Sequence, residues 1–117
     1  MNRDRLLADA KAKALELAQD YAPPAKVEVA LPGRSGRLAL CMSVDALRLK
    51  GAATAHDGVV TDQLARVLSG GETDILDAVG EDHLLKLERE AFMALVRHPA
   101  TLARMEHMLE TGKPLRN

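Results

Sequence analysis

The residues of this sequence that could carry out chemistry are its histidines, its cysteine and its carboxylates. The four histidines stand at positions 56, 83, 98 and 107. No two of them have the His-x-x-x-His spacing that places two metal ligands on one helical face. His56 and His83 fall near predicted helix starts and His98 precedes a proline, which favours terminal or surface positions. The pattern therefore predicts no metal site.

Cys41 is the lone cysteine, so an internal disulfide is excluded and a reducing compartment is favoured. It falls on the apolar face of a predicted helix, where cysteine is usually a small core residue, and no sequence feature gives it a base. The glutamates of the C-terminal third are typical of solvated helix faces; they are Glu88, Glu90, Glu106 and Glu110. We therefore predict no catalytic residue in this chain.

Residues 32–36 (PGRSG) place glycines before a predicted helix, as a phosphate-binding loop does. They lack the Gly-x-x-x-x-Gly-Lys-Ser/Thr spacing of that loop, so a plain turn is predicted. The methionines at 42, 93, 105 and 108 are typical of core filler, or alternatively of a surface that meets another protein domain.

Composition favours one helical domain over residues 1–117. The chain has one Phe, one Tyr and no Trp, which leaves a core of Leu, Ala, Val and Met that suits helix packing better than a β-sandwich. A net charge of −1 argues against a nucleic-acid or anionic-membrane partner. No apolar run approaches the roughly 18 residues of a membrane-spanning helix. We expect a soluble, cytoplasmic protein.

The elements that must position these residues are predicted from hydrophobic periodicity. We expect an all-α fold of about five helices in a small orthogonal bundle, with no substantial sheet. The helices are predicted over residues 2–21, about 35–50, about 54–70, 81–98 and 99–111, with a short helical turn over 73–79. Thr54 and Asp57 have capping-box spacing. Residues 27–31 alternate as a short extended arm or edge strand that has no evident partner.

Apolar stripes on these helices predict what they bury. In the helix at 35–50 the inward set is predicted to be Leu38, Cys41, Met42, Ala46 and Leu49. The last two helices form a coupled pair, separated by Pro99 and closed by Gly112 in a left-handed cap. The first of the pair carries Leu84, Leu85, Ala91, Phe92, Leu95 and Val96, and the second is predicted to bury Leu102, Met105, Met108 and Leu109. We expect these stripes to pack against one another.

The C-terminal third resembles the end of the crotonase family. The resemblance lies in residues 87–92 (LEREAF), 95–101 (LVRHPAT) and 104–117 (RMEHMLETGKPLRN). Residues 31–37, 55–57 and 64–71 add a resemblance to the last part of bacterial multifunctional β-oxidation enzymes. These enzymes join an NAD-dependent 3-hydroxyacyl-CoA dehydrogenase to an enoyl-CoA hydratase. The resemblance implies that this chain is the C-terminal fragment of such an enzyme.

The resemblance also sets expectations for the chain's role. Neither a Gly-x-Gly-x-x-Gly fingerprint nor the strands of a complete hydratase is present, so NAD and the CoA thioester are expected to bind elsewhere in the parent enzyme. C-terminal helices of crotonases cover the acyl-CoA pocket and help to pack subunits. Lys113 matches the Lys-Pro ending of the family and is the candidate contact to CoA phosphates. Thr111 and Met108 depart from the family pattern, and a structural role for Lys113 near a helix end is the alternative.

Partners follow from the same expectation. The exposed apolar faces are expected to meet the remainder of the parent polypeptide or another subunit, or to cause self-association of the isolated chain. The alternative is a free-standing helical module that binds a protein partner through a methionine-rich groove.

Overall fold

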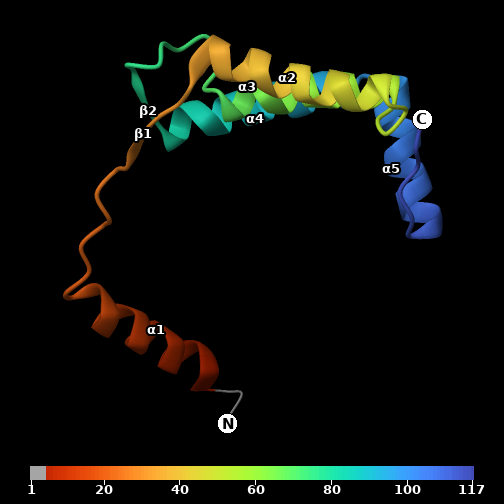
Figure 1. Ribbon diagram of the computed structural model, residues 1–117. Coiled ribbons are helices and arrows are strands. Elements are labelled where there is room, and N and C mark those ends of the chain that lie inside the picture. Colours follow the sequence, from red (N-terminus) through yellow and green to blue (C-terminus); the bar gives the residue numbers. More distant parts are fainter. Residues whose placement is uncertain (1–4) are drawn as a thin grey trace.

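The computed structural model describes residues 5–117 as five helices and one two-stranded antiparallel sheet (Figure 1). The predominantly helical class predicted from the sequence is confirmed. The predicted start of the first helix at residue 2 lies outside the described residues. The order along the chain is α1 (Leu6–Ala18), β1 (Glu28–Ala30), α2 (Gly33–Leu49), α3 (Ala55–Leu68), β2 (Ala78–Gly80), α4 (Glu81–Leu95) and α5 (Pro99–Thr111).

Local sequence signals account for several helix ends. At the start of α3, the Thr54 hydroxyl accepts from the Asp57 N–H at 3.1 Å, and the Thr54 N–H donates to the Asp57 carboxylate at 2.7 Å. The predicted capping box is therefore confirmed. Helix α5 begins at Pro99, and Gly112 follows it with φ of 67°, as the predicted left-handed cap requires.

The segment before α4 differs from its prediction. Residues 73–79 contain no helix; their last two residues belong to β2, which pairs with β1 in the register Val29↔Val79. Two sequence expectations were therefore wrong, the helical turn at 73–79 and the strand without a partner. Ile75 and Leu76 lie in a turn in which the Asp77 N–H donates to the Asp74 carbonyl at 3.0 Å and the Leu76 N–H to the Asp74 carboxylate at 3.1 Å. β2 follows this turn and pairs with a strand far away in the sequence.

Helix α3 lies between α2 and α4 in a single layer (Figure 1). The side of α2 that faces α3 carries Gly33, Arg37, Cys41 and Val44, none of which is fully exposed. Leu38, Met42 and Leu49 of the predicted inward set are instead 62%, 62% and 91% exposed. That part of the prediction was wrong, because periodicity identifies an apolar stripe but not which side of the helix finds a neighbour.

Helix α5 does not fold back along α4 but crosses the end of the layer (Figure 1). The backbone of His98 is extended, with ψ of 123°, so the chain changes direction before Pro99 starts the next helix. The predicted burial of the α5 stripe was therefore wrong. Its four apolar side chains are at least 42% exposed; they are Leu102, Met105, Met108 and Leu109.

The described chain is far more open than a compact domain of its length. Its radius of gyration is 21.2 Å, against about 13 Å for a compact chain of this size. Its accessible surface is 9262 Å², against about 6,200 Å² for a compact monomer of 12.6 kDa. Fully buried apolar residues are few; they are Ala65, Val79, Leu87 and Ala91. About 3,000 Å² of surface is therefore in excess of what a self-sufficient domain exposes.

Gly33 is the position where a side chain is least tolerable. It has φ of 57°, its N–H donates to the Ser69 carbonyl at 3.0 Å, and an added Cβ would lie 2.6 Å from the Thr73 carbonyl oxygen. We expect Gly33→Ala to lower the free energy of unfolding by about 2–3 kcal/mol, measured by urea denaturation. Gly51→Ala is the matched control, since Gly51 has φ of 69° and no neighbour within 4 Å. Equal losses in the two variants would contradict the role given to the close approach at Gly33.

Candidate functional site

A polar cluster joins the start of α3 to α5 and the C-terminal tail. The Arg104 guanidinium lies 2.8 Å from the Asp57 carboxylate and donates to the Thr54 hydroxyl at 3.1 Å. It also donates to the side-chain oxygen of Asn117 at 2.6 Å and to its backbone oxygen at 3.2 Å. We call Arg104, Thr54, Asp57 and Asn117 the Arg104 clasp. One side chain thus holds a helix start and the chain's last residue together.

The charge state of Asp57 indicates that the Arg104 clasp has a structural role. The Thr54 backbone N–H, the Arg104 guanidinium and the Thr54 hydroxyl lower the pKa of Asp57 to about 2, although partial burial opposes the shift. Asp57 is therefore a carboxylate throughout the physiological range. A general acid or base needs a pKa near the working pH, so Asp57 suits neither role.

His56 lies beside the clasp and is buried, at 5% exposed. Its Nε2 is 2.9 Å from the Thr101 hydroxyl, and its ring centroid is 4.7 Å from that of His98. Burial, and then the charges of Arg104 and His98, lower the pKa of His56. The sequence correctly placed His56 at a helix start, and of the two alternatives, a terminal or a surface position, the structure has the terminal one. The ring is buried because α5 covers it. The ring is a neutral packing group at neutral pH.

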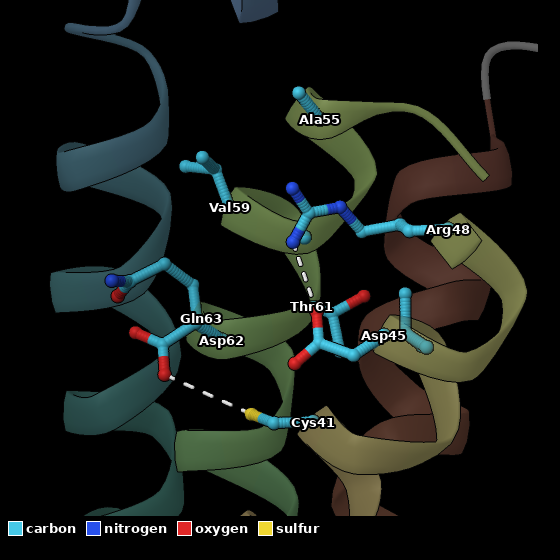
Figure 2. A pocket seen from close by; sticks show the side chains of 10 residues that line it. Cys41, Asp45, Arg48, Ala55, Val59, Thr61, Asp62 and Gln63 are labelled. Carbon is cyan, nitrogen blue, oxygen red and sulfur yellow. Dashed lines mark hydrogen bonds and ion pairs between the residues drawn. The ribbon is translucent and has the colours of Figure 1, made fainter.

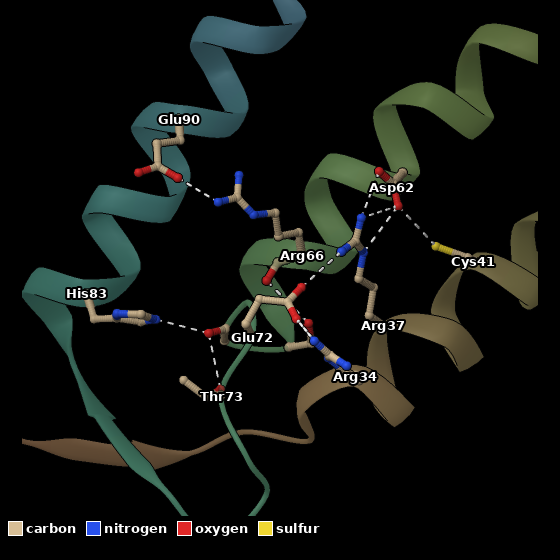
Figure 3. Close-up of polar contacts among 11 residues, drawn as sticks. Arg34, Arg37, Cys41, Asp62, Arg66, Glu72, Thr73, His83 and Glu90 are labelled. Carbon is tan, nitrogen blue, oxygen red and sulfur yellow. Dashed lines mark hydrogen bonds and ion pairs between the residues drawn. The ribbon is translucent and has the colours of Figure 1, made fainter.

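His98 and His83 also make structural contacts. His98 Nδ1 accepts from the Ala100 N–H at 3.3 Å and so caps α5. His83 Nε2 lies 3.0 Å from the Gly70 carbonyl oxygen (Figure 3). Among residues 5–117, no three histidine, cysteine or carboxylate side chains gather closely enough to hold a metal ion.

A second polar cluster lies between α2 and α3 (Figure 3). Arg37 donates to the Asp62 carboxylate at 2.8 and 3.0 Å, and Cys41 Sγ lies 3.9 Å from the same carboxylate. Burial raises the pKa of the Cys41 thiol, and the negative charge of Asp62 raises it further. The thiol is therefore protonated, and Asp62 is already paired with Arg37.

A hollow of about 490 Å³ lies beside this second cluster, between α2 and α3, and is lined by Cys41, Asp45, Arg48 and Asp62 among others (Figure 2). A separate hollow adjoins residues 32–35 and is lined by Arg34 as well as by Glu72 and Asp74, and Arg34 is paired with Glu72. The Gly33 N–H there is bonded to the Ser69 carbonyl, so it is not free to bind a phosphate.

An apolar groove runs between α3 and α4. It has a volume of about 700 Å³ and is lined mainly by Leu64, Val67, Leu68, Leu85, Phe92 and Leu95, with Gln63, Glu88 and Arg89 at its rim. We call it the α3–α4 groove. Leu64, Leu68 and Phe92 remain 54–60% exposed in it. The sequence predicted most of these side chains to be apolar contacts between helices, and the structure leaves them open to a partner.

Lys113 is exposed just beyond the left-handed Gly112, and its N–H donates to the Thr111 hydroxyl at 3.2 Å. The tail then returns along α5, where the Asn117 side chain donates to the Ala100 carbonyl at 2.9 Å. The Arg116 guanidinium donates to the Ala52 carbonyl at 2.9 Å. Lys113 therefore lies at a fixed turn, at the far end of α5 from the Arg104 clasp.

Sequence reasoning found half of the clasp. The capping box marked Thr54 and Asp57, whereas Arg104 and Asn117 carried no signal. Their contacts cross 50 residues for Arg104 to Thr54 and 13 for Arg104 to Asn117. Only the direction of α5 brings them together.

The clasp predicts how stability changes in acid. Because the pKa of Asp57 is about 2 in the folded chain, below the ordinary 3.8, the carboxylate adds stability above pH 4 that is lost as pH falls through 2. We expect Asp57→Asn to lower the free energy of unfolding by about 1 kcal/mol at pH 6, a partly solvent-screened value. The difference from the unmodified chain should narrow toward pH 2. Urea denaturation at several pH values measures this, with Asp20→Asn, outside the clasp, as control. A constant difference at all pH values would contradict the assignment.

Within residues 5–117, no helix combines the length and apolar character needed to cross a membrane. No family model and no solved structure matches the chain. The chain is similar to a Bacillus subtilis (strain 168) protein described as a probable 3-hydroxyacyl-CoA dehydrogenase, with 42% identity over 118 aligned residues. The match covers 100% of this chain and 15% of the relative, in the relative's C-terminal region.

Proposed function

We propose that this chain forms the C-terminal helical part of an enzyme that oxidises 3-hydroxyacyl-CoA, and that its role there is packing rather than catalysis. The observation that carries the proposal is the 42% identity along the entire chain to a probable 3-hydroxyacyl-CoA dehydrogenase. The chain spans only 15% of that relative, so we propose the oxidation for the whole enzyme and not for this chain alone.

The open surface supports a packing role. The chain exposes 9262 Å², about 3,000 Å² more than a compact monomer of its mass. Much of this surface is apolar, including Leu38 and Met42 on α2 and Leu102 on α5. Such faces are expected to be covered by the rest of the polypeptide or by another subunit.

The polar groups of the described residues support the absence of chemistry. Asp57 is held as a carboxylate by Arg104, the pKa of Cys41 is raised, and His56 is buried against His98. In the proposed parent enzyme, a dehydrogenase part passes hydride from the 3-hydroxy group's carbon to NAD. By the crotonase resemblance, a hydratase part adds water to an enoyl-CoA. Both reactions would use residues outside this chain.

The size of the native gene product tests the proposal most directly. We expect an immunoblot of source-cell lysate, with antiserum raised against this chain, to show one band several times heavier than 12.6 kDa. Mass spectrometry of that band should find peptides of this chain joined to dehydrogenase sequence. A band at this chain's own mass would overturn the proposal.

Lys113 is the proposed contact to CoA. Its exposed position at a fixed turn suits a cation that meets a phosphate from solvent. We expect Lys113→Ala to weaken binding of CoA, measured by calorimetry, by about threefold to tenfold, because one charge-assisted contact is lost. Lys50→Ala, another exposed lysine, is the control. The measurement uses the parent enzyme, where the remaining contacts to CoA are expected, and equal affinities of the two variants there would contradict the contact.

The α3–α4 groove favours a second candidate, a free-standing module that binds an amphipathic segment of another protein. The α3–α4 groove is lined by none of Met42, Met93, Met105 and Met108. It is therefore not the methionine-rich groove that the sequence predicted for such a module. A native product at 12.6 kDa would leave this candidate as the better one.

A further inference from the structure

Helix α1 stands apart from the layer at the end of an extended segment (Figure 1). All of its side chains are exposed, including Leu6 at 48%, Leu17 at 64% and the following Tyr21 at 69%. With Ala10 and Ala14 these residues form one apolar stripe. An isolated helix of 13 residues is only marginally stable in water, so α1 needs a surface to pack against.

The α3–α4 groove has the dimensions and chemistry that such a helix needs. At about 1.5 Å per residue, α1 is about 20 Å long, and the lining of the groove from Leu85 to Leu95 extends about 15 Å along α4. The groove presents leucine, valine and phenylalanine side chains between two helices. An amphipathic helix that lays its apolar stripe between two helices is a recurring mode of recognition.

The segment between α1 and β1 determines whether α1 can pack into the α3–α4 groove of its own chain or into that of another molecule. Residues 21–27 are extended, and Pro23 and Pro24 stiffen them as a spacer. The ladder between β1 and β2 fixes the far end of this spacer beside α4. The spacer leads to an α1 that lies apart from the α2, α3 and α4 helices of its own chain (Figure 1). A groove on another molecule remains available to it.

We propose that two copies of this chain exchange their α1 helices, each α1 packing into the α3–α4 groove of the other copy. A two-fold symmetric exchange covers the apolar stripes of both α1 helices and fills both grooves through one self-complementary interface. A stable interface needs about 800 Å² from each partner, and each chain has about 3,000 Å² in excess. The proposal names the partner for part of the apolar surface on which the proposed function rests.

Light scattering during size-exclusion chromatography tests the exchange at about 50 µM chain. We expect a particle of twice 12.6 kDa. Leu17→Glu on α1 and Leu68→Glu in the groove each place a charge on the exchanged contact and should weaken dimerisation at least tenfold. Leu49→Glu is the matched control, since Leu49 is 91% exposed on α2, away from the groove, and the dimer should survive that change.

Mixing completes the test. The Leu17→Glu chain keeps an unmodified α3–α4 groove, and the Leu68→Glu chain keeps an unmodified α1. An equimolar mixture should therefore form a heterodimer in which this α1 packs into this groove. A monomeric unmodified chain, a dimer that survives either variant, or a mixture that stays monomeric would overturn the exchange. A heavy native gene product together with a monomeric chain would reject the exchange while leaving the proposed function in place.

Discussion

Three arginine–carboxylate pairs hold α2, α4 and α5 to α3. Arg37 of α2 lies 2.8 Å from Asp62, Arg66 of α3 lies 2.6 Å from Glu90 of α4, and Arg104 of α5 lies 2.8 Å from Asp57. The arginine side chains are 24–31% exposed, so the pairs are screened only in part. Each contributes modest free energy, but the planar guanidinium fixes how each neighbour is oriented. The arrangement of the molecule depends on these polar joints more than on a shared apolar core.

The use of ion pairs as contacts between helices explains why so much apolar surface remains exposed. The contact between α2 and α3 is built on Gly33, Arg37, Cys41 and Val44, so the leucines of α2 lie on other sides of the helix. At the other end, the clasp turns α5 across the layer, which prevents its stripe from reaching α4. A chain that uses its polar residues for internal contacts and leaves its apolar residues outside is suited to assembly with other protein surface.

Two titratable groups of the described residues also make structural contacts. The His56 ring lies against Thr101 and His98, and the Cys41 thiol, whose pKa is raised, lies beside Asp62. Perturbed pKa values often mark active sites, but here the shifts have structural causes. Burial is the main cause for Cys41 and His56, and the pKa of Asp57 is lowered by the Thr54 N–H of its own capping box and then by Arg104. The proposed role as a packing segment of a 3-hydroxyacyl-CoA-oxidising enzyme is consistent with that distribution.

The sequence by itself determined the elements whose signals are local: the helical class, the Thr54–Asp57 capping box, the α5 start at Pro99 and the left-handed cap at Gly112. These depend on backbone geometry within a few residues, which residue type controls directly. The tertiary structure alone decided the pairing of β1 with β2, the burial of His56 and the meeting of Arg104 with Asn117. It also decided that α2 and α5 present their apolar stripes outward. Periodicity states that a helix has an apolar face, but only the directions of neighbouring helices determine whether that face is covered.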